Sequence, residues 1–283
     1  MISSTSSSLS HEEYLRKKRQ KKLFRYGLVV FIFISLVALL SYISHRPQIR
    51  ISKVELFGGV LVTQNEIESM LLSEMSGSYF WLFPKNNSFI YSKDGLEKHL
   101  KETFKRIDTI NIYRKNLKTL IIEIKERKPV AMWCGDLPSD TEECYFIDQN
   151  STIFAKAPTF SGDAYFKFYG STRSLQVDFP TSDPIGKEYI ASTTEFVEIS
   201  YFILKTKELL LRPQYLVAKE NNEFSLFIAD GGEILFDMKI PLVIVVQNLK
   251  ALLRTPALAF SDEVLPVEYI DLRYGNKLFY KLK

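Results

Sequence analysis

Hydrophobic residues follow three patterns along this chain, and each pattern predicts a different kind of structure. An apolar run without a single charge extends from Gly27 to Ile43. After it, apolar and polar residues alternate with a period of two in several short segments, which is typical of half-buried β-strands. In a few longer segments apolar residues recur every three or four positions, which indicates amphipathic helices. The patterns together predict an α+β protein behind one membrane helix.

The apolar run predicts a transmembrane helix over residues 26–44. With Tyr26 or Ser44 it reaches the lower end of the roughly 17–25 residues that span a bilayer. Basic residues precede it densely and follow it sparsely, and basic residues stay on the cytoplasmic side. Residues 1–25 are therefore predicted to be a cytoplasmic basic tail, with the bulk of the chain outside. A cleaved signal peptide is the alternative, but its apolar core would be shorter and small residues would mark a cut site, whereas this run exits through SYISHRP.

The charge is confined to that tail. The formal net charge is +4, yet the rest of the chain carries 30 basic and 31 acidic residues. A nucleic-acid-binding domain would spread basic charge over a folded face, so we expect no nucleic-acid partner. The membrane lipid is the partner that the tail and the apolar run imply.

Residues 49–128 predict the order strand, helix, helix, strand, strand. The first strand ends at Gly58-Gly59, and Thr63 with Glu66 forms a capping box that starts the first helix. Ser92 is a suitable cap for the second helix. Two strands, 107–113 and 117–126, close the unit. The aromatic stretch SYFWLF (78–83) is predicted to be a loop whose rings pack beneath a helix.

Pro129 interrupts the strand pattern, since proline fixes its own φ and forces the preceding residue to be extended. The charged residues before it predict an interdomain junction, read either as a polar latch or as a partner site; they are Glu126, Arg127 and Lys128. Residues 129–283 are predicted to form a curved antiparallel β-sheet domain with helices. One helix is predicted over 185–211, with Tyr189, Phe196, Ile203 and Leu210 near one face, and another over 240–253. Hairpin turns are predicted at Asn221-Asn222 and at Asp230-Gly231-Gly232.

No catalytic, metal or cofactor site is predicted. His11, His45 and His99 lack the spacing of metal ligands, and no phosphate-binding loop or nucleophile elbow occurs. An acidic cluster could suggest calcium, but it lacks the alternate-oxygen spacing of a binding loop and is better explained as a solvated hairpin tip; it comprises Asp136, Asp140, Glu142 and Glu143.

The two cysteines end one predicted strand and begin the next. If these strands pair antiparallel, Cys134 and Cys144 face each other, and an oxidising space outside the membrane favours a structural disulfide. Two buried reduced thiols are the alternative.

The layout resembles the FtsQ/DivIB family of bacterial cell-division proteins. The βααββ order directly after a single anchor is similar to a POTRA domain, and ERKPVAMW resembles the junction that follows it in that family. Three later stretches are similar to family segments: CYFIDQNSTIF (144–154), with Asp148 at the usual acidic position, PTFSG (158–162) and YIDLRYGNKLFY (269–280). Two positions depart from the family pattern, since Leu117 replaces a usual proline and Ser151 a common glycine.

The resemblance implies a non-enzymatic bitopic scaffold at the division septum of the inner membrane. Its implied partners are small bitopic proteins of the FtsB and FtsL type, with FtsK and the FtsW/FtsI synthase complex as further candidates. The family docks the small partners on its closing strands, by strand addition to a sheet edge. The matching positions in this chain are Arg273, Tyr274, Gly275, Asn276, Lys277, Leu278, Phe279 and Tyr280.

Two other functions remain open from the sequence. A membrane-anchored cell-wall enzyme would need a clefted constellation of catalytic residues, and a POTRA-bearing export or assembly factor would usually show repeated units or a barrel.

Overall fold

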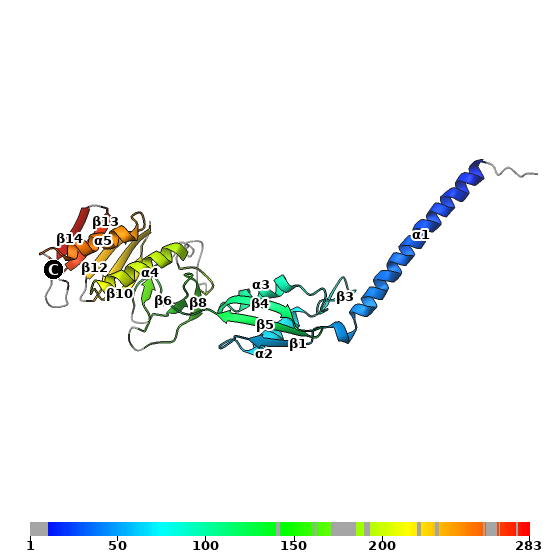
Figure 1. Ribbon diagram of the computed structural model, residues 1–283, viewed down its shortest axis with the longest axis horizontal. Coiled ribbons are helices and arrows are strands. Elements are labelled where there is room, and N and C mark those ends of the chain that lie inside the picture. The colour runs from blue at the N-terminus through cyan, green and yellow to red at the C-terminus, as the bar shows by residue number, and fades with distance from the viewer. Residues whose placement is uncertain are drawn as a thin grey trace, which may run out of the picture. The chain divides into compact units, whose positions relative to one another are not determined.

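The computed structural model shows an α+β protein with one long apolar N-terminal helix and a large curved mixed sheet (Figure 1). The structure describes residues 11–139, 142–160, 162, 164–170, 185–189, 193–219, 222–229, 232–256, 258, 265, 267–275 and 277–283, with side chains from residue 14 onward. Contacts divide the chain into two compact units. The first comprises residues 1–100 and 109–125, and the second comprises residues 101–108 and 126–283.

Helix α1 (His11–Ser44) contains the apolar run. Its segment Tyr14–Ser44 is long and apolar enough to cross a membrane. Only 6% of its most apolar window is buried by protein, so this is not the core helix of a globular domain. The apolar side chains are instead left exposed, as a lipid-facing helix requires.

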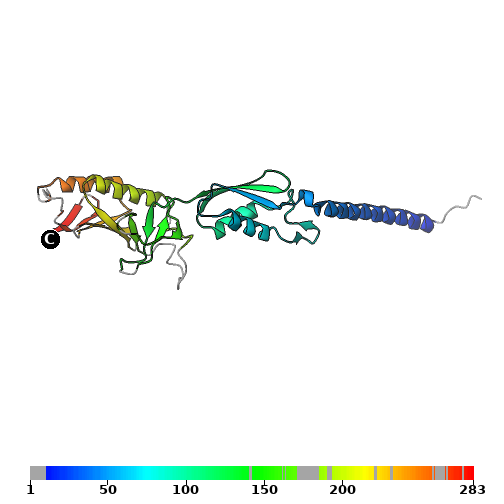
Figure 2. The ribbon, with the colours of Figure 1, turned by 90° about the horizontal axis from the view of Figure 1, so that it is seen from below.

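Between α1 and Pro129 the chain forms one three-stranded sheet, a short hairpin and two helices; residues 101–108, at the end of α3 and the start of β4, group with the second unit. The elements are η1 (Pro47–Ile49), β1 (Lys53–Phe57), α2 (Gln64–Glu74), β2 (Ser78–Tyr79), β3 (Phe83–Pro84), α3 (Lys93–Thr103), β4 (Ile107–Arg114) and β5 (Thr119–Glu126). The sheet order is β1-β5-β4, with β1 parallel to β5. Figure 2 shows α2 and α3 on one face of this sheet.

Local capping explains where the two helices begin. The Glu66 backbone N–H donates to Thr63 Oγ1 at 3.4 Å, and the Thr63 N–H donates to the Glu66 carboxylate at 2.8 Å, which confirms the predicted capping box. At α3 the Gly95 N–H donates to Ser92 Oγ at 3.2 Å. The buried faces of both helices then pack on the sheet through Leu71, Leu96 and Leu100, among others.

The prediction for the aromatic stretch 78–83 is wrong. It forms the β2–β3 hairpin, and the two rings at its turn, Phe80 and Trp81, do not pack beneath a helix. Trp81 is 95% exposed and Phe80 is 89% exposed. The reason is the tight turn, which points both side chains away from the unit.

The second unit holds a nine-stranded sheet and two helices. The elements are β6 (Ala131–Trp133), β7 (Tyr145–Ile147), β8 (Ile153–Lys156), β9 (Lys167–Tyr169), α4 (Thr193–Glu208), β10 (Pro213–Ala218), β11 (Glu223–Ile228), β12 (Gly232–Asp237), α5 (Leu242–Leu253), β13 (Val267–Tyr274) and β14 (Lys277–Leu282). The strand order is β14-β13-β12-β11-β10-β9-β6-β7-β8.

This sheet is mixed, so the prediction of an antiparallel sheet is corrected. The pairs β6·β9, β9·β10 and β12·β13 are parallel. A parallel connection needs a crossover of a dozen or more residues, and α4 and α5 supply two of them. Both crossovers run from one strand to its parallel neighbour in the same direction. Because such connections are right-handed, both helices cover the same face of the sheet, as Figure 2 shows.

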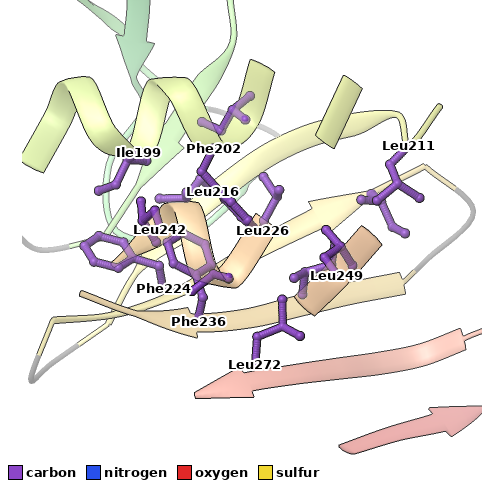
Figure 3. Close-up of a cluster of buried hydrophobic side chains, with 14 of the residues drawn as sticks. Ile199, Phe202, Leu211, Leu216, Phe224, Leu226, Phe236, Leu242, Leu249 and Leu272 are labelled. Carbon is purple, nitrogen blue, oxygen red and sulfur yellow. The ribbon is translucent and has the colours of Figure 1, made fainter. Parts of the chain in front are cut away.

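The core of the second unit lies between that face and the two helices. Phe202 of α4 packs against Phe236 of β12 with ring centroids 4.5 Å apart. Leu249 of α5 and Leu272 of β13 are fully buried in the same cluster (Figure 3). Burial of this apolar surface is what holds the mixed sheet and its helices together.

The predicted helix over 185–211 is shorter in the structure. It begins at Thr193, and Tyr189 lies before it, buried in the core with its hydroxyl donating to the Tyr169 carbonyl oxygen at 2.8 Å. Leu210 follows the helix with a φ of 65° and is 78% exposed, so it does not share the apolar face. The helix predicted over 240–253 is present as α5. Asn221, Asp230 and Gly231, predicted to form turns, lie outside the described residues.

Candidate partner-binding edge of the nine-stranded sheet

Strand β14 is the last strand of the nine-stranded sheet and pairs with β13 alone. The two strands are antiparallel, with Ile270 opposite Tyr280 and Asp271 opposite Phe279. Gly275, between them, has a φ of +65°, which glycine adopts without strain. Its carbonyl oxygen accepts a hydrogen bond from Asn248 Nδ2 of α5 at 2.7 Å, which fixes the turn to the helix.

The opposite edge of the sheet is already covered at the start of β8. Strand β8 receives and donates backbone hydrogen bonds there: Ile153 N–H donates to the Lys187 carbonyl oxygen at 2.7 Å, and Gly186 N–H donates to the Ile153 carbonyl oxygen at 2.6 Å. Among the described residues, no backbone segment pairs with the outer edge of β14. Within the described part of the chain, β14 therefore presents an open edge, and an unpaired edge is a template for a further strand.

Exposed aromatic side chains lie on β14 and at the adjoining end of β13. Tyr274 is 56% exposed and Phe279 is 49% exposed, and their rings meet edge to face with centroids 5.4 Å apart. Tyr280 is also exposed, on the strand position opposite the buried Ile270. Leu278 is partly buried and packs against the core. The edge thus combines free backbone groups with apolar surface, which is the chemistry of strand addition.

An ion-pair network fixes the base of this edge. The Arg273 guanidinium donates to both carboxylate oxygens of Asp271, at 2.9 and 2.6 Å, and to Glu223 of β11 at 2.6 Å. Burial of the Asp271 carboxyl raises its pKa, but the hydrogen bonds from Arg273 outweigh burial and leave the pKa below its ordinary value. The hydrogen bonds to Asp271 raise the pKa of Arg273 in turn. The Arg273 guanidinium therefore donates its hydrogen bonds to carboxylates of the sheet and links β13 to β11.

The predicted partner-binding residues do not all have the same environment. Tyr274, Phe279 and Tyr280 are exposed at the edge, Lys277 is exposed beside them, and Arg273 and Leu278 are partly buried. Asn276 lies outside the described residues. Sequence reasoning missed Glu223 and Asn248, which hold the edge in place. They are 50 and 27 residues from their partners, so no local pattern marks them.

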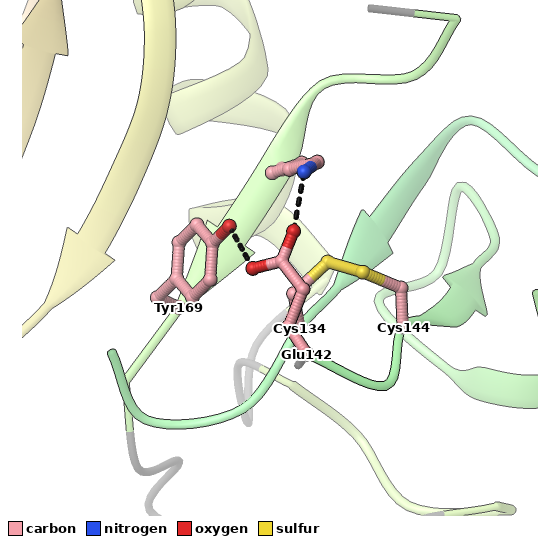
Figure 4. The surroundings of a disulfide bond; sticks show 5 residues. Cys134, Glu142, Cys144 and Tyr169 are labelled. Atoms are coloured by element: carbon pink, nitrogen blue, oxygen red, sulfur yellow. Dashed lines mark hydrogen bonds and ion pairs between the residues drawn. A yellow bond between two sulfur atoms is a disulfide. The ribbon is translucent and has the colours of Figure 1, made fainter. Parts of the chain in front are cut away.

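A disulfide joins Cys134 and Cys144 across the β6–β7 loop, with an S–S distance of 2.04 Å. Glu142 lies beside it and accepts hydrogen bonds from Lys167 Nζ and, at 2.6 Å, from the Tyr169 hydroxyl (Figure 4). Burial raises the pKa of Glu142, but the hydrogen bonds from Lys167 and Tyr169 lower it by more than burial raises it. The pKa of Glu142 is therefore below its ordinary value. The possible metal-ligand atoms of Cys134, Glu142 and Cys144 lie within 4.8 Å of one another. Because the sulfurs are bonded to each other, neither is a thiolate ligand for a metal.

The acidic loop residues turn to different cations rather than to one centre. Glu143 accepts from Lys156 at 2.7 Å, while Glu142 accepts from Lys167. Asp136 is exposed, and Asp140 lies outside the described residues.

The junction residue Arg127 is held by several groups of the second unit. Its guanidinium pairs with Asp148, lies 3.8 Å from Asp108 and donates to the Lys105 carbonyl oxygen at 3.1 Å. Asp148 is buried, and its Oδ1 accepts from the Asn150 and Thr152 backbone N–H groups. Arg127 thus fastens the chain just before β6, while Lys128 is exposed and Pro129 and Glu126 are half-buried.

Two of the histidines are placed by the structure. His45 Nδ1 lies 2.8 Å from the Ser41 carbonyl oxygen, and His99 Nε2 lies 3.9 Å from a Glu74 carboxylate oxygen. They belong to different elements and share no ligand cluster with each other. The side chain of His11 is outside the described residues.

The chain matches no protein-family model, and no curated protein sequence aligns with it significantly.

Proposed function

We propose that this protein is a non-enzymatic, single-pass membrane scaffold of the bacterial division septum, a divergent member of the FtsQ/DivIB family whose β14 edge receives a strand from a small bitopic partner. The motifs quoted above carry the family proposal, together with an apolar helix followed by an α+β chain. In this proposal the first unit after the anchor is a POTRA domain. The basic tail is cytoplasmic, and the second unit and the part of the first unit that follows α1 lie outside the inner membrane.

The single observation that carries the binding proposal is the asymmetry between the two sheet edges. The β8 edge is paired with residues 186–189, whereas the β14 edge is open among the described residues and flanked by exposed rings. Aromatic anchors that are exposed in the free protein commonly dominate an interface. A partner strand of the FtsB or FtsL type would gain backbone hydrogen bonds from β14 and side-chain contacts from Tyr274 and Phe279.

The proposal is tested by photocrosslinking in dividing cells. A photoreactive amino acid is placed at Tyr274 or Phe279, with Val197 of α4 as the control because it is equally exposed on a different element. We expect capture of a small bitopic coiled-coil protein from the two edge positions and not from the control. Equal capture at all three positions, or capture only at Val197, would show that the edge is not the docking site.

A variant pair gives an independent readout. Phe279→Ala and Tyr280→Ala should each reduce capture from Tyr274 and septal localisation of the partner, without lowering the amount of folded protein, because both rings are exposed. Leu204→Ala, which removes an exposed side chain from α4, is the matched control and should change neither.

A further inference from the structure

The β2–β3 hairpin of the first unit ends in an unusual turn. Tyr79 pairs with Phe83, and the Leu82 N–H donates to the Tyr79 carbonyl oxygen at 3.0 Å. The two central residues, Phe80 and Trp81, have φ angles of 48° and 61°. Positive φ at both central positions is the geometry of a type I′ turn, which strongly prefers Asn-Gly.

Phe80 and Trp81 are disfavoured at these positions on two grounds. Bulky side chains rarely adopt positive φ, so the backbone is strained at both residues. Both rings also lie almost entirely in contact with solvent rather than with the first unit. Backbone strain of this kind is a pointer to function, and exposed apolar side chains mark sites where a protein meets a partner or a membrane.

Hydrogen bonds place this hairpin against the last turn of α1. Ser41 Oγ of α1 donates to the Leu82 carbonyl oxygen at 2.7 Å. Asn87, shortly after β3, donates through Nδ2 to Ser44 Oγ at 2.6 Å, and both of these residues are buried. Figure 1 shows β3 beside the C-terminal end of α1. The aromatic turn therefore adjoins the point where the apolar run ends, at Ile43.

The depth of this contact follows from helix geometry. The apolar run from Gly27 to Ile43 has 17 residues, and at 1.5 Å per residue it covers about 25 Å, slightly less than the ~30 Å hydrocarbon core. Ser41 lies two residues before the end of this run, so in a membrane-spanning α1 it would be near the edge of the hydrocarbon core, where water becomes scarce. The Leu82 carbonyl oxygen satisfies that hydroxyl, and the hairpin is held at the same level.

The surroundings have the composition of a membrane interface. Arg46 stacks over the exposed Tyr42 ring, 4.5 Å from its centroid, and donates to its hydroxyl at 2.5 Å. Arg114 lies over the ring of Phe89, which is also exposed, at 5.2 Å. Tyrosine and tryptophan rings are enriched at membrane–water interfaces, and long arginine side chains near the ends of membrane helices extend toward the headgroups. Tyr42 lies in the last turn of α1, Arg46 follows shortly after it, and Phe89 lies two residues after Asn87, which donates to Ser44 of α1.

We propose that the β2–β3 turn inserts Phe80 and Trp81 into the headgroup–acyl boundary of the bilayer that α1 crosses. The inserted rings give the first unit a second attachment to the outer leaflet, beside the helix itself. Two attachments restrict how that unit tilts on its anchor. The proposal requires α1 to span the bilayer, but it requires no division partner.

Tryptophan fluorescence tests this directly, because the chain has two tryptophans. In W133F, Trp81 is the sole reporter; in W81F, the sole reporter is Trp133, whose Nε1 donates to the Gly170 carbonyl oxygen in the second unit. The full chain is reconstituted into phosphatidylcholine–phosphatidylglycerol vesicles, with or without lipids brominated near the carbonyl end or the methyl end of the acyl chain. We expect strong quenching in W133F, greater with the carbonyl-end bromines, and little quenching in W81F.

The positive control is F33W in a W81F/W133F background, which reports from near the middle of the apolar run of α1. It should be quenched most by the methyl-end bromines. If W133F showed no bromine quenching but full quenching by aqueous iodide, Trp81 would be in water and the proposal would be wrong. Absence of bromine quenching in the F33W variant would mean that α1 does not enter the bilayer, and the proposal would then be wrong.

A second measurement separates membrane contact from folding. F80N/W81G restores the residues that a type I′ turn prefers, so in detergent micelles the first unit should unfold at the same or a higher temperature than in the native protein. A lower unfolding temperature, combined with no bromine quenching of Trp81 in W133F, would mean that the rings pack on protein, which would contradict their insertion into lipid.

Discussion

The Arg273 network supports a prediction about the stability of the second unit. Arg273→Ala removes the cation that lies between Asp271 and Glu223 and leaves two carboxylates facing each other. The Asp271 side chain is 9% exposed, so in the variant its negative charge would be left without its cation where little water can solvate it. Removing one member of a fully buried pair costs about 3–5 kcal/mol. Because Arg273 and Glu223 are 25% and 32% exposed, solvent screening reduces the expected loss to about 2–3 kcal/mol.

Equilibrium unfolding in urea measures this loss. The full chain is studied in detergent micelles in a W81F background, so that Trp133 alone reports on the second unit. With a denaturant slope of about 2 kcal/mol per molar, the unfolding midpoint should fall by about 1–1.5 M urea. Lys281→Ala is the matched control: it breaks the 2.5 Å pair with Glu268, but both groups are exposed, and the midpoint should not move.

The pH dependence gives a sharper signature. In the native protein the pKa of folded Asp271 is lowered, so its contribution to stability is present above its ordinary pKa of about 3.9 and is lost as the pH falls through the lowered folded value. Without Arg273, burial and the Glu223 charge raise the pKa of Asp271 instead. Protonation then favours the folded variant, so the gap between the two proteins should narrow from pH 7 toward pH 4. A midpoint equal to that of the control, or a gap independent of pH, would refute the reasoning.

Three further predictions concern the rest of the fold. Replacing Cys134 and Cys144 together by serine should lower the free energy of unfolding of the second unit by about 2–3 kcal/mol, because the bridge closes a loop with a sequence separation of 10. Dithiothreitol should lower the urea midpoint of the native protein by the same amount and should not change that of the variant. Gly58→Ala should lower the free energy of unfolding by more than about 2 kcal/mol, measured by thermal circular dichroism, because the new Cβ would lie 2.2 Å from a backbone oxygen of β5. Gly77→Ala is the control: Gly77 also has a positive φ but has open space around it, so the loss should be about 1 kcal/mol. Leu249→Ala should cost about 3 kcal/mol by urea unfolding, because the side chain is fully buried in the core; a loss below about 1 kcal/mol would mean that α5 does not complete that core.

The sequence by itself determined the elements whose causes are local. A charge-free apolar run suffices for α1, and a reciprocal pair three residues apart suffices to start α2 at Thr63. The segments 107–113 and 117–126 alternate apolar and polar residues, and this local pattern suffices to predict β4 and β5. Each of these signals involves residues within a few positions of one another, where periodicity and capping act directly.

Only the tertiary structure decided which strands lie side by side. Alternation is the same in parallel and antiparallel strands, so it could not show that β9·β10 and β12·β13 are parallel; the intervening helices α4 and α5 decide this by their length and handedness. The cover on the β8 edge, the open β14 edge and the pairing of Glu223 with Arg273 likewise depend on segments far apart in sequence. The exposure of Trp81 has a similar origin. An aromatic residue is apolar wherever it occurs, and whether it meets protein, water or lipid is set by the turn that carries it and by the helix end beside it.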